Sequence, residues 1–140
     1  YEHTIGVPLL MRGPGIPSGR RLKAQCVLRD LFPTLCALTG ISEPGNRVDG
    51  VSLKPVIDGK TEQVRPFVVG YFRGFQRMIR TPEWKFIEYP EVERQQLFDL
   101  QADPNELTNL LDDPDSRKVT DQLKRQLRQW QQANGVPLGS

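Results

Sequence analysis

The sequence is poor in the residues on which most metal and nucleophilic sites depend. It has one histidine, His3, and two cysteines among its 140 residues. One histidine with no second His or Cys at ligand spacing does not make a zinc site. No G-x-S-x-G elbow and no G-x-x-x-x-G-K-S/T phosphate loop occurs. We therefore predict no catalytic residue and no metal ligand within this chain.

Long apolar runs and a strong net charge are also missing. No stretch approaches the roughly 18 apolar residues of a membrane helix, so no membrane partner is predicted. The net charge of +2 is spread over interspersed acidic and basic residues, which gives no basis for a nucleic-acid partner. The spacing of Cys26 and Cys36 does not favour a disulfide, and we interpret them as small buried hydrophobic residues.

The first half of the chain combines an apolar run with turn-rich segments. Residues 5 to 11 read as a buried strand. Residues 31 to 39 predict a helix that Asp30 caps and Gly40 ends, with one apolar face made by Leu31, Leu35 and Leu38. The chain begins at Tyr1 without a Met and inside an apolar-rich segment, so we expect it to be a piece of a longer protein.

The second half has a different texture. Short β-branched and aromatic segments separated by turns predict a small antiparallel sheet over residues 67 to 100. A helix should follow, with Asp113 as its cap, Pro114 in its first turn and Asn134 and Gly135 at its end. Four residues at helical spacing should pack it against the sheet, namely Val119, Leu123, Leu127 and Trp130.

The stretch "LFDLQADPNELTNLL" at residues 97 to 111 is rich in acidic residues but lacks the ligand spacing of a calcium loop. We interpret it as scaffold: Asp103 caps a short helical turn, and Glu106 completes an arrangement like a capping box. Leu107, Leu110 and Leu111 should then lie under the sheet.

Arginines and aromatics gather in the first hairpin, at residues 71 to 80. Guanidinium groups bind anions through a fixed fork of donors. Arg73 and Arg77 are therefore the candidate substrate-binding residues, on a rim that could face an anion or a sugar. The alternative is a solvated hairpin with ordinary surface charge.

Five pieces in one order resemble the C-terminal third of the type I sulfatases, the formylglycine-dependent enzymes of the alkaline phosphatase superfamily. They cover nearly all of residues 1 to 133 and read "YEHTIGVPLLMRGPGI", "LRDLFPTLCALTGI", "DGVSLKPVIDG", "MIRTPEWKFIEY" and "LFDLQADPNELTNL".

The resemblance implies an α/β fold, which is α+β for this part of the chain. Residues 1–66 would carry the last strand and helix of a large α/β domain and a wrapping loop. Residues 67–140 would form a four-stranded antiparallel subdomain with a terminal helix. The resemblance also implies a periplasmic, extracellular or lysosomal location, although the sequence itself shows no compartment.

Family chemistry, as the resemblance implies it, uses a formylglycine made within C/S-x-P-x-R and a calcium-type divalent cation. Neither cysteine of this chain has Pro two residues on. The nearest approach, residues 42 to 46, has Asn46 where Arg is needed. The resemblance also implies that the metal carboxylates and a catalytic Lys precede Tyr1. We therefore expect a sulfatase part that is inactive alone, uses no cofactor itself, and has the rest of the sulfatase chain and a sulfated small molecule or carbohydrate as partners.

Two other readings stay open. One is a phosphodiesterase or phosphonate hydrolase of the same superfamily, and the other is a free-standing binding module that presents the arginine-rich hairpin. Because the strand at residues 5 to 11 would have no partner strand, self-association of the isolated chain is also expected.

Overall fold

The computed structural model describes residues 1–43 and 48–136. These residues form two compact units. The first joins residues 1–7 to the chain from Phe67 onward, and the second is Pro8–Pro66. No helix in the described ranges is long and apolar enough to cross a membrane.

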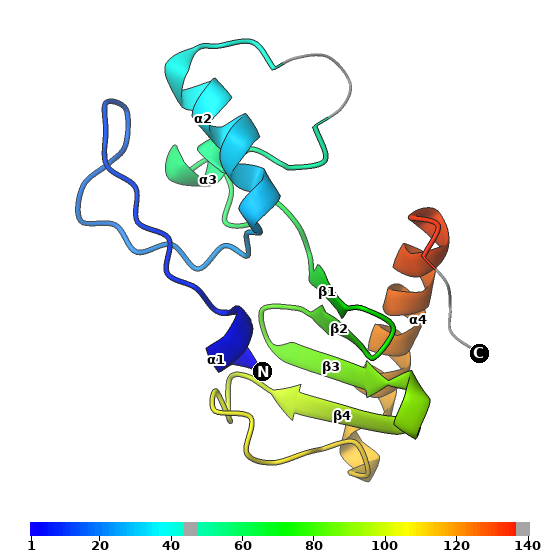
Figure 1. Cartoon of the computed structure of the whole chain (residues 1–140). Coiled ribbons are helices and arrows are strands. Elements are labelled where there is room, and N and C mark those ends of the chain that lie inside the picture. Colours follow the sequence, from blue (N-terminus) through cyan, green and yellow to red (C-terminus); the bar gives the residue numbers. More distant parts are fainter. Residues whose placement is uncertain (44–47, 137–140) are drawn as a thin grey trace. The chain divides into compact units, whose positions relative to one another are not determined.

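The first unit is built on a four-stranded antiparallel sheet (Figure 1). Its strands are β1 (Val68–Phe72), β2 (Gln76–Arg80), β3 (Trp84–Tyr89) and β4 (Arg94–Asp99). They lie in the order β1-β2-β3-β4, so every neighbour in space is also the next strand in the chain. Short connections make this arrangement possible because antiparallel strands need only a hairpin turn between them. The predicted sheet over residues 67 to 100 is confirmed.

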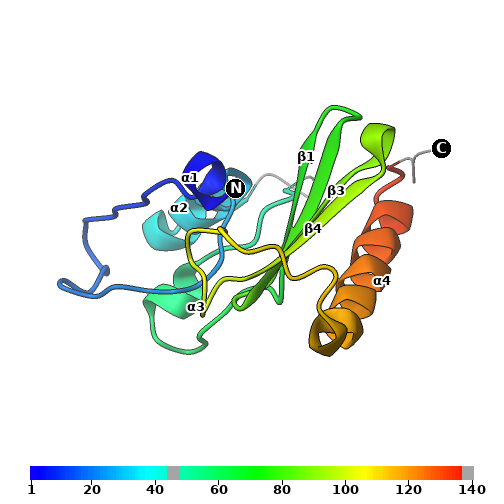
Figure 2. The same cartoon turned by 90° about the horizontal axis from the view of Figure 1, so that it is seen from below.

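Helix α4 (Arg117–Ala133) packs along one face of this sheet (Figure 2). Strand alternation turns Ile79, Phe86 and Leu97 toward the helix, where they form the core with Leu123 and Leu127. The start of the helix is as predicted: the Asp113 side chain accepts from the Asp115 amide at the 3₁₀ turn η3 (Pro114–Ser116). Val119 packs on the same core. The ring of Trp130 stacks on Tyr71 with centroids 5.8 Å apart, so the predicted apolar face is confirmed.

The opposite face of the sheet is covered near β3 and β4 by the start of the chain. The short helix α1 (Glu2–Ile5) follows Tyr1, whose ring centroid lies 6.0 Å from that of Phe98. The Tyr1 hydroxyl donates to Gln96 Oε1 at 3.1 Å. Residues far apart in the sequence therefore share one layer of the first unit.

The second unit centres on helix α2 (Leu31–Thr39), which follows the 3₁₀ turn η1 (Leu28–Asp30), and on the short helix α3 (Lys54–Ile57). Asp30 and Thr34 are fully buried, and the Thr34 hydroxyl accepts from the Leu53 amide at 2.8 Å. Gly40 ends α2 with φ +73°, a left-handed conformation that glycine adopts without strain. The predicted helix at residues 31 to 39 is thus confirmed.

The predicted strand at residues 5 to 11 is wrong. Ile5 belongs to α1, and residues 6 to 12 form no helix or strand. Val7 and Leu10 are 76% and 89% exposed. A strand needs a hydrogen-bonded neighbour for its backbone, and none of the described strands pairs with this segment. An apolar run does not supply that neighbour by itself.

Two details of the predicted helix at residues 31 to 39 also need correction. The Asp30 side chain does not cap α2; it accepts from the amides of Val27 and Val51 and pairs with Arg65. The apolar stripe is not the buried side either, because Leu35 is 52% exposed. The buried side carries Pro33, Thr34 and Cys36 instead.

Residues 97 to 99 of the acidic stretch belong to β4, and the remainder to residue 111 forms turns and loop with no helical turn. Asp103 accepts from the Thr108 amide, and Glu106 has φ +56° and a buried side chain, so the predicted capping arrangement is wrong. Leu110 and Leu111 pack against the core as expected, whereas Leu107 is 82% exposed. Long-range contacts of Glu106, described below, take precedence over local capping here.

Candidate functional site

The tip of the first hairpin presents a cation between exposed aromatic rings. Arg73 lies in the turn between β1 and β2 with φ +52°, and its guanidinium carbon lies 5.8 Å from the centroid of the Phe72 ring. Phe72 is 62% and Phe75 46% exposed. Exposed rings beside a guanidinium suit a ligand that combines an anionic group with an apolar face.

Arg77 has a different environment. It lies on the α4 face of β2, its side chain is 6% exposed, and Nη1 lies 3.4 Å from Glu88 Oε1 on β3. The structure therefore does not bring Arg73 and Arg77 together, because one is at the exposed tip and the other is within the sheet-helix layer.

Arg80 takes part in a charged cluster on the opposite face of the sheet. Its Nε lies 2.9 Å from Glu2 Oε1. The same oxygen lies 2.6 Å from the ammonium of Lys85, which also lies 2.8 Å from Glu106 Oε1. The side chains of Lys85 and Glu106 are 0% and 1% exposed. We call these four residues, Glu2, Arg80, Lys85 and Glu106, the anchor cluster.

Sequence reasoning missed the anchor cluster. Its signal was weak: Lys85 stands between Trp84 and Phe86 in "WKFIEY", and alternation places it on the face opposite Phe86 and the apolar core. Buried lysines are rare unless paired. The carboxylates that pair with it lie 83 and 21 residues away in sequence, where no local pattern points to them.

The electrostatics of Glu2 follow from these contacts. Burial raises the pKa of its carboxyl group, but the hydrogen bonds and charges of Arg80 and Lys85 outweigh burial and hold the pKa below its ordinary value. Glu2 is therefore charged at neutral pH, and the cluster contains two positive and two negative side chains. A buried ion pair needs this kind of mutual compensation.

A groove of about 450 Å³ lies at the start of α4. Both acidic and basic side chains line it, and one of its carboxylates, Asp113, already accepts from the Asp115 amide. Its lining residues are Gln95, Leu111, Asp112, Asp113, Arg117, Thr120, Asp121 and Lys124. Its mixed charge gives no preference for one kind of ligand.

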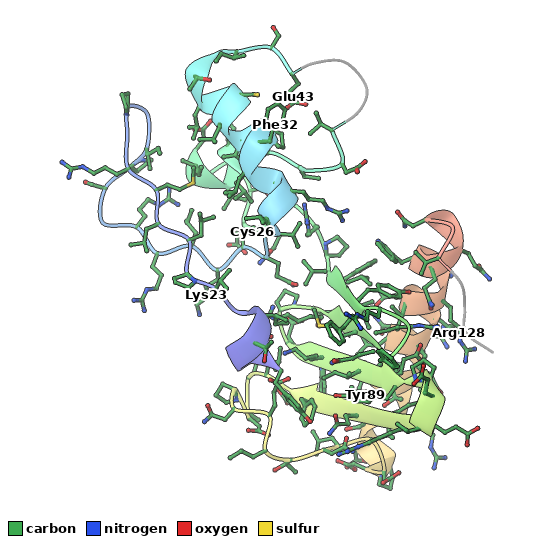
Figure 3. All side chains as sticks on the ribbon, viewed as in Figure 1. Lys23, Cys26, Phe32, Glu43, Tyr89 and Arg128 are labelled. Atoms are coloured by element: carbon green, nitrogen blue, oxygen red, sulfur yellow. The ribbon has the colours of Figure 1, made fainter. Side chains whose placement is uncertain are left out.

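The two cysteines are free thiols, Cys26 exposed and Cys36 buried. Figure 3 shows Cys26 in the extended segment before α2. Partial burial and the Asp30 carboxylate raise the pKa of the Cys26 thiol, against the opposing charge of Arg65. Within residues 1–43 and 48–136, no three His, Cys, Asp or Glu residues are placed so that they could hold a metal ion.

Comparison with known proteins identifies the family. The family of the C-terminal region of N-sulphoglucosamine sulphohydrolase matches residues 1–133. A Delta 4,5-hexuronate-2-O-sulfatase of Bacteroides thetaiotaomicron is 36% identical over 131 residues, 85% of this chain and 27% of that protein. Human arylsulfatase K is 37% identical over 124 residues, and a choline-sulfatase of Rhizobium meliloti is 41% identical over 120. These two matches cover 79% and 81% of this chain and 23% of each relative.

Solved structures agree. The structure of a 2-O GAG sulfatase superposes on 74% of this chain and 24% of its own, with a TM-score of 0.63 and 32% identity. A phosphonate monoester hydrolase of Agrobacterium radiobacter superposes on 71% of this chain and 23% of its own, with a TM-score of 0.53 and 28% identity. The chain thus spans about a quarter of the length of the relatives it matches. It belongs to the family of the C-terminal region of N-sulphoglucosamine sulphohydrolase, and it is similar to the C-terminal part of sulfatases of the alkaline phosphatase superfamily.

Proposed function

We propose that this chain completes a sulfuric ester hydrolase whose remaining three quarters supply the reacting groups. The observation that carries the proposal is the family match over residues 1–133 together with the quarter-length coverage of sulfatase relatives. In this proposal the substrate is a sulfated small molecule or carbohydrate. The isolated chain is expected to hydrolyse no sulfate ester.

The cation and the formylglycine belong to the rest of the parent in this proposal. The described residues bring no three potential ligands together, and neither Cys26 nor Cys36 lies in a C-x-P-x-R sequence. The described residues therefore do not fit the cation, and the two cysteines do not fit the formylglycine sequence. A calcium ion bound in the parent would stabilise the anionic oxygens of the sulfate, and a formylglycine residue there would provide the nucleophile.

Exposed apolar side chains in the second unit support a protein partner. Leu28, Phe32 and Leu35 recur at helical spacing along η1 and α2, with exposures of 82%, 50% and 52%. Figure 3 shows Phe32 projecting from α2. An apolar stripe of this kind normally meets another surface. We propose the rest of the sulfatase chain as its partner. In the isolated chain the same stripe favours self-association, which sedimentation at increasing concentration would measure.

The contribution of this part to the reaction is proposed to be a wall of the substrate pocket at the tip of the β1–β2 hairpin. Arg73 would contact an anionic or polyhydroxylated substrate, since it combines exposure with positive charge and neighbouring aromatic rings. Arg77, the second predicted substrate contact, would reach a ligand only after leaving Glu88. Alanine variants of Arg73 and Arg77 therefore distinguish a contact with the substrate from a contact within the protein.

The experiment replaces each arginine by alanine in the full-length parent and compares its natural substrate with a small aryl sulfate. A hydrogen bond from Arg73 to a charged substrate group should be worth about 1.5–3 kcal/mol. Arg73→Ala should therefore lower kcat/KM about 10- to 100-fold for the natural substrate only. Arg73→Lys keeps the charge and should recover part of the loss, whereas Arg128→Ala on the exposed side of α4 should have no effect.

Unchanged kinetics of Arg73→Ala with both substrates would refute the pocket role. A parent that hydrolyses phosphonate monoesters and no sulfate ester would instead favour the alternative hydrolase, to which the Agrobacterium neighbour points. Saturable aryl sulfate turnover by the isolated 140-residue chain would contradict the proposal that the rest of the parent supplies the reacting groups.

A further inference from the structure

The anchor cluster ties the start of the chain to side chains of β2, β3 and the loop after β4, which lie 78 or more residues later in sequence. Glu2 accepts from Arg80 through both carboxylate oxygens, at 2.9 and 3.4 Å, and pairs with Lys85 at 2.6 Å. The backbone amide of Glu2 also donates to Glu106 Oε2. Both the side chain and the backbone of Glu2 are therefore held.

The chemistry of Lys85 makes the contact with Glu2 necessary. An ammonium that is 0% exposed has lost its water, and a buried charge without partners is strongly unfavourable. Glu106 supplies one counter-charge and Glu2 the second, while Arg80 balances the extra carboxylate. Arg80, Lys85 and Glu106 thus form a charged binding site that holds residues 1–2 of the same chain.

Helix α1 cannot hold this position by itself. It has four residues, which is far below the length at which an isolated helix is stable in water. Its attachment depends on side-chain contacts with the sheet, to which Tyr1 adds the hydrogen bond to Gln96 and the ring contact with Phe98. This binding site includes a residue with a strained backbone, because Glu106 has φ +56°. Such strain persists where surrounding contacts determine a conformation, and it is frequent at functional positions.

We propose that the anchor cluster fixes the course of the chain that leads into Tyr1, and that Glu2, Lys85 and Glu106 are positioning residues for hydrolysis in the parent. This inference rests on the proposed function. In a parent that continues upstream of Tyr1, consecutive Cα atoms are about 3.8 Å apart. Groups carried a few residues before Tyr1 therefore lie within about 10–15 Å of the anchor, and their placement depends on whether Glu2 is held.

The test uses the full-length parent with a small aryl sulfate, which cannot report on contacts to the remainder of a larger substrate. The variants are Glu2→Gln, Lys85→Met and Glu106→Gln. The matched control is Leu127→Ala, which weakens the same unit from the α4 face without touching the anchor. Thermal unfolding ranks all four by loss of stability, and amide exchange over residues 2–7 reports whether the N-terminal segment has come loose.

A displacement of about 1 Å at a reacting centre can cost about 100-fold in rate. Glu2→Gln should therefore lower kcat about 10- to 100-fold with KM changed less than about twofold, and amide exchange over residues 2–7 should accelerate. Leu127→Ala should keep kcat and the slow exchange of residues 2–7 at temperatures where it is folded, although its Tm is lower.

Equal losses of kcat in Glu2→Gln and Leu127→Ala, at equal losses of Tm, would overturn the positioning role and leave only a contribution to stability. An unchanged kcat in Glu2→Gln with accelerated exchange over residues 2–7 would overturn it as well. If the unmutated parent hydrolyses no sulfate ester, the proposed function fails. Unchanged exchange over residues 2–7 in all three variants would show separately that the cluster is not an anchor.

Discussion

The buried carboxylate of Asp30 should control the stability of the second unit. It is fully buried and accepts three donors: the Val27 amide at 2.8 Å, the Val51 amide at 2.9 Å and the Arg65 guanidinium at 2.5 Å. These bonds join η1, the loop before α3 and the end of the unit. Because the donors approach from three separate segments, the carboxylate connects parts of the unit that lie far apart in the sequence.

Asp30→Asn keeps the shape of the side chain but removes its charge and one acceptor. Arg65, whose side chain is 12% exposed, then loses its counter-ion, and one backbone N–H is left facing an NH₂ group. Breaking a buried ion pair on one side costs about 3–5 kcal/mol. Since about 1.4 kcal/mol corresponds to a factor of ten, amides of α2 should exchange between about 100-fold and several thousand-fold faster.

The choice of assay follows from the composition of the two units. Both tryptophans, Trp84 and Trp130, and all three tyrosines lie in the first unit, so aromatic fluorescence does not report on the second. Hydrogen exchange followed by mass spectrometry does, and the Leu53 amide bonded to Thr34 is a suitable reporter. The control is Asp58→Asn, since Asp58 pairs with Lys54 and Lys60 at the surface.

Asp58→Asn should leave amide exchange unchanged, because exposed ion pairs contribute little. If Asp30→Asn changes the exchange of α2 amides by less than about threefold, which is under about 0.7 kcal/mol, the reasoning about this carboxylate is refuted.

Three more predictions concern other parts of the chain. Leu123→Ala and Trp130→Ala should each lower the free energy of unfolding of the first unit by about 2–5 kcal/mol in denaturant titrations. Circular dichroism should follow the unfolding, because Trp130 is itself a fluorophore. A loss below about 0.5 kcal/mol in both variants would mean that α4 is not docked. Gly50→Ala should destabilise the second unit in hydrogen exchange, since its Cβ would lie 2.1 Å from the carbonyl oxygen of Arg29. Gly70→Ala should be milder, because the atoms nearest its Cβ would belong to the side chain of Met78 and not to backbone. The pKa of Glu2 is lowered from 4.5 in the folded chain. The contribution of its carboxylate to stability is therefore complete above pH 4.5 and is lost as pH falls through the lower folded-state pKa. The Tm difference between the unmutated chain and Glu2→Gln should shrink below pH 4.5, and a pH-independent difference would contradict this.

Local patterns in the sequence were enough to predict the sheet over residues 67 to 100, the helix at residues 31 to 39, the helix that follows Asp113 and Pro114, and the family. Hairpin turns join strands that are neighbours in sequence, and a 3.6-residue apolar period identifies the face of α4 that packs. These signals depend on residues a few positions apart. The ordered family pieces add the fold and the sulfatase assignment, because they place the chain in register with longer proteins.

Only the tertiary structure decided which partners the buried charged side chains have. Asp30 reads as a local cap and Glu106 as part of a capping box, yet both carboxylates are taken by donors far away in sequence. Lys85 lies on the face of β3 opposite the apolar core, is fully buried, and pairs with Glu2 and Glu106. Local capping contributes about 1 kcal/mol, whereas an unpaired buried charge costs several. The pairing of buried charges therefore prevails over local preference, and no short window of sequence contains both partners.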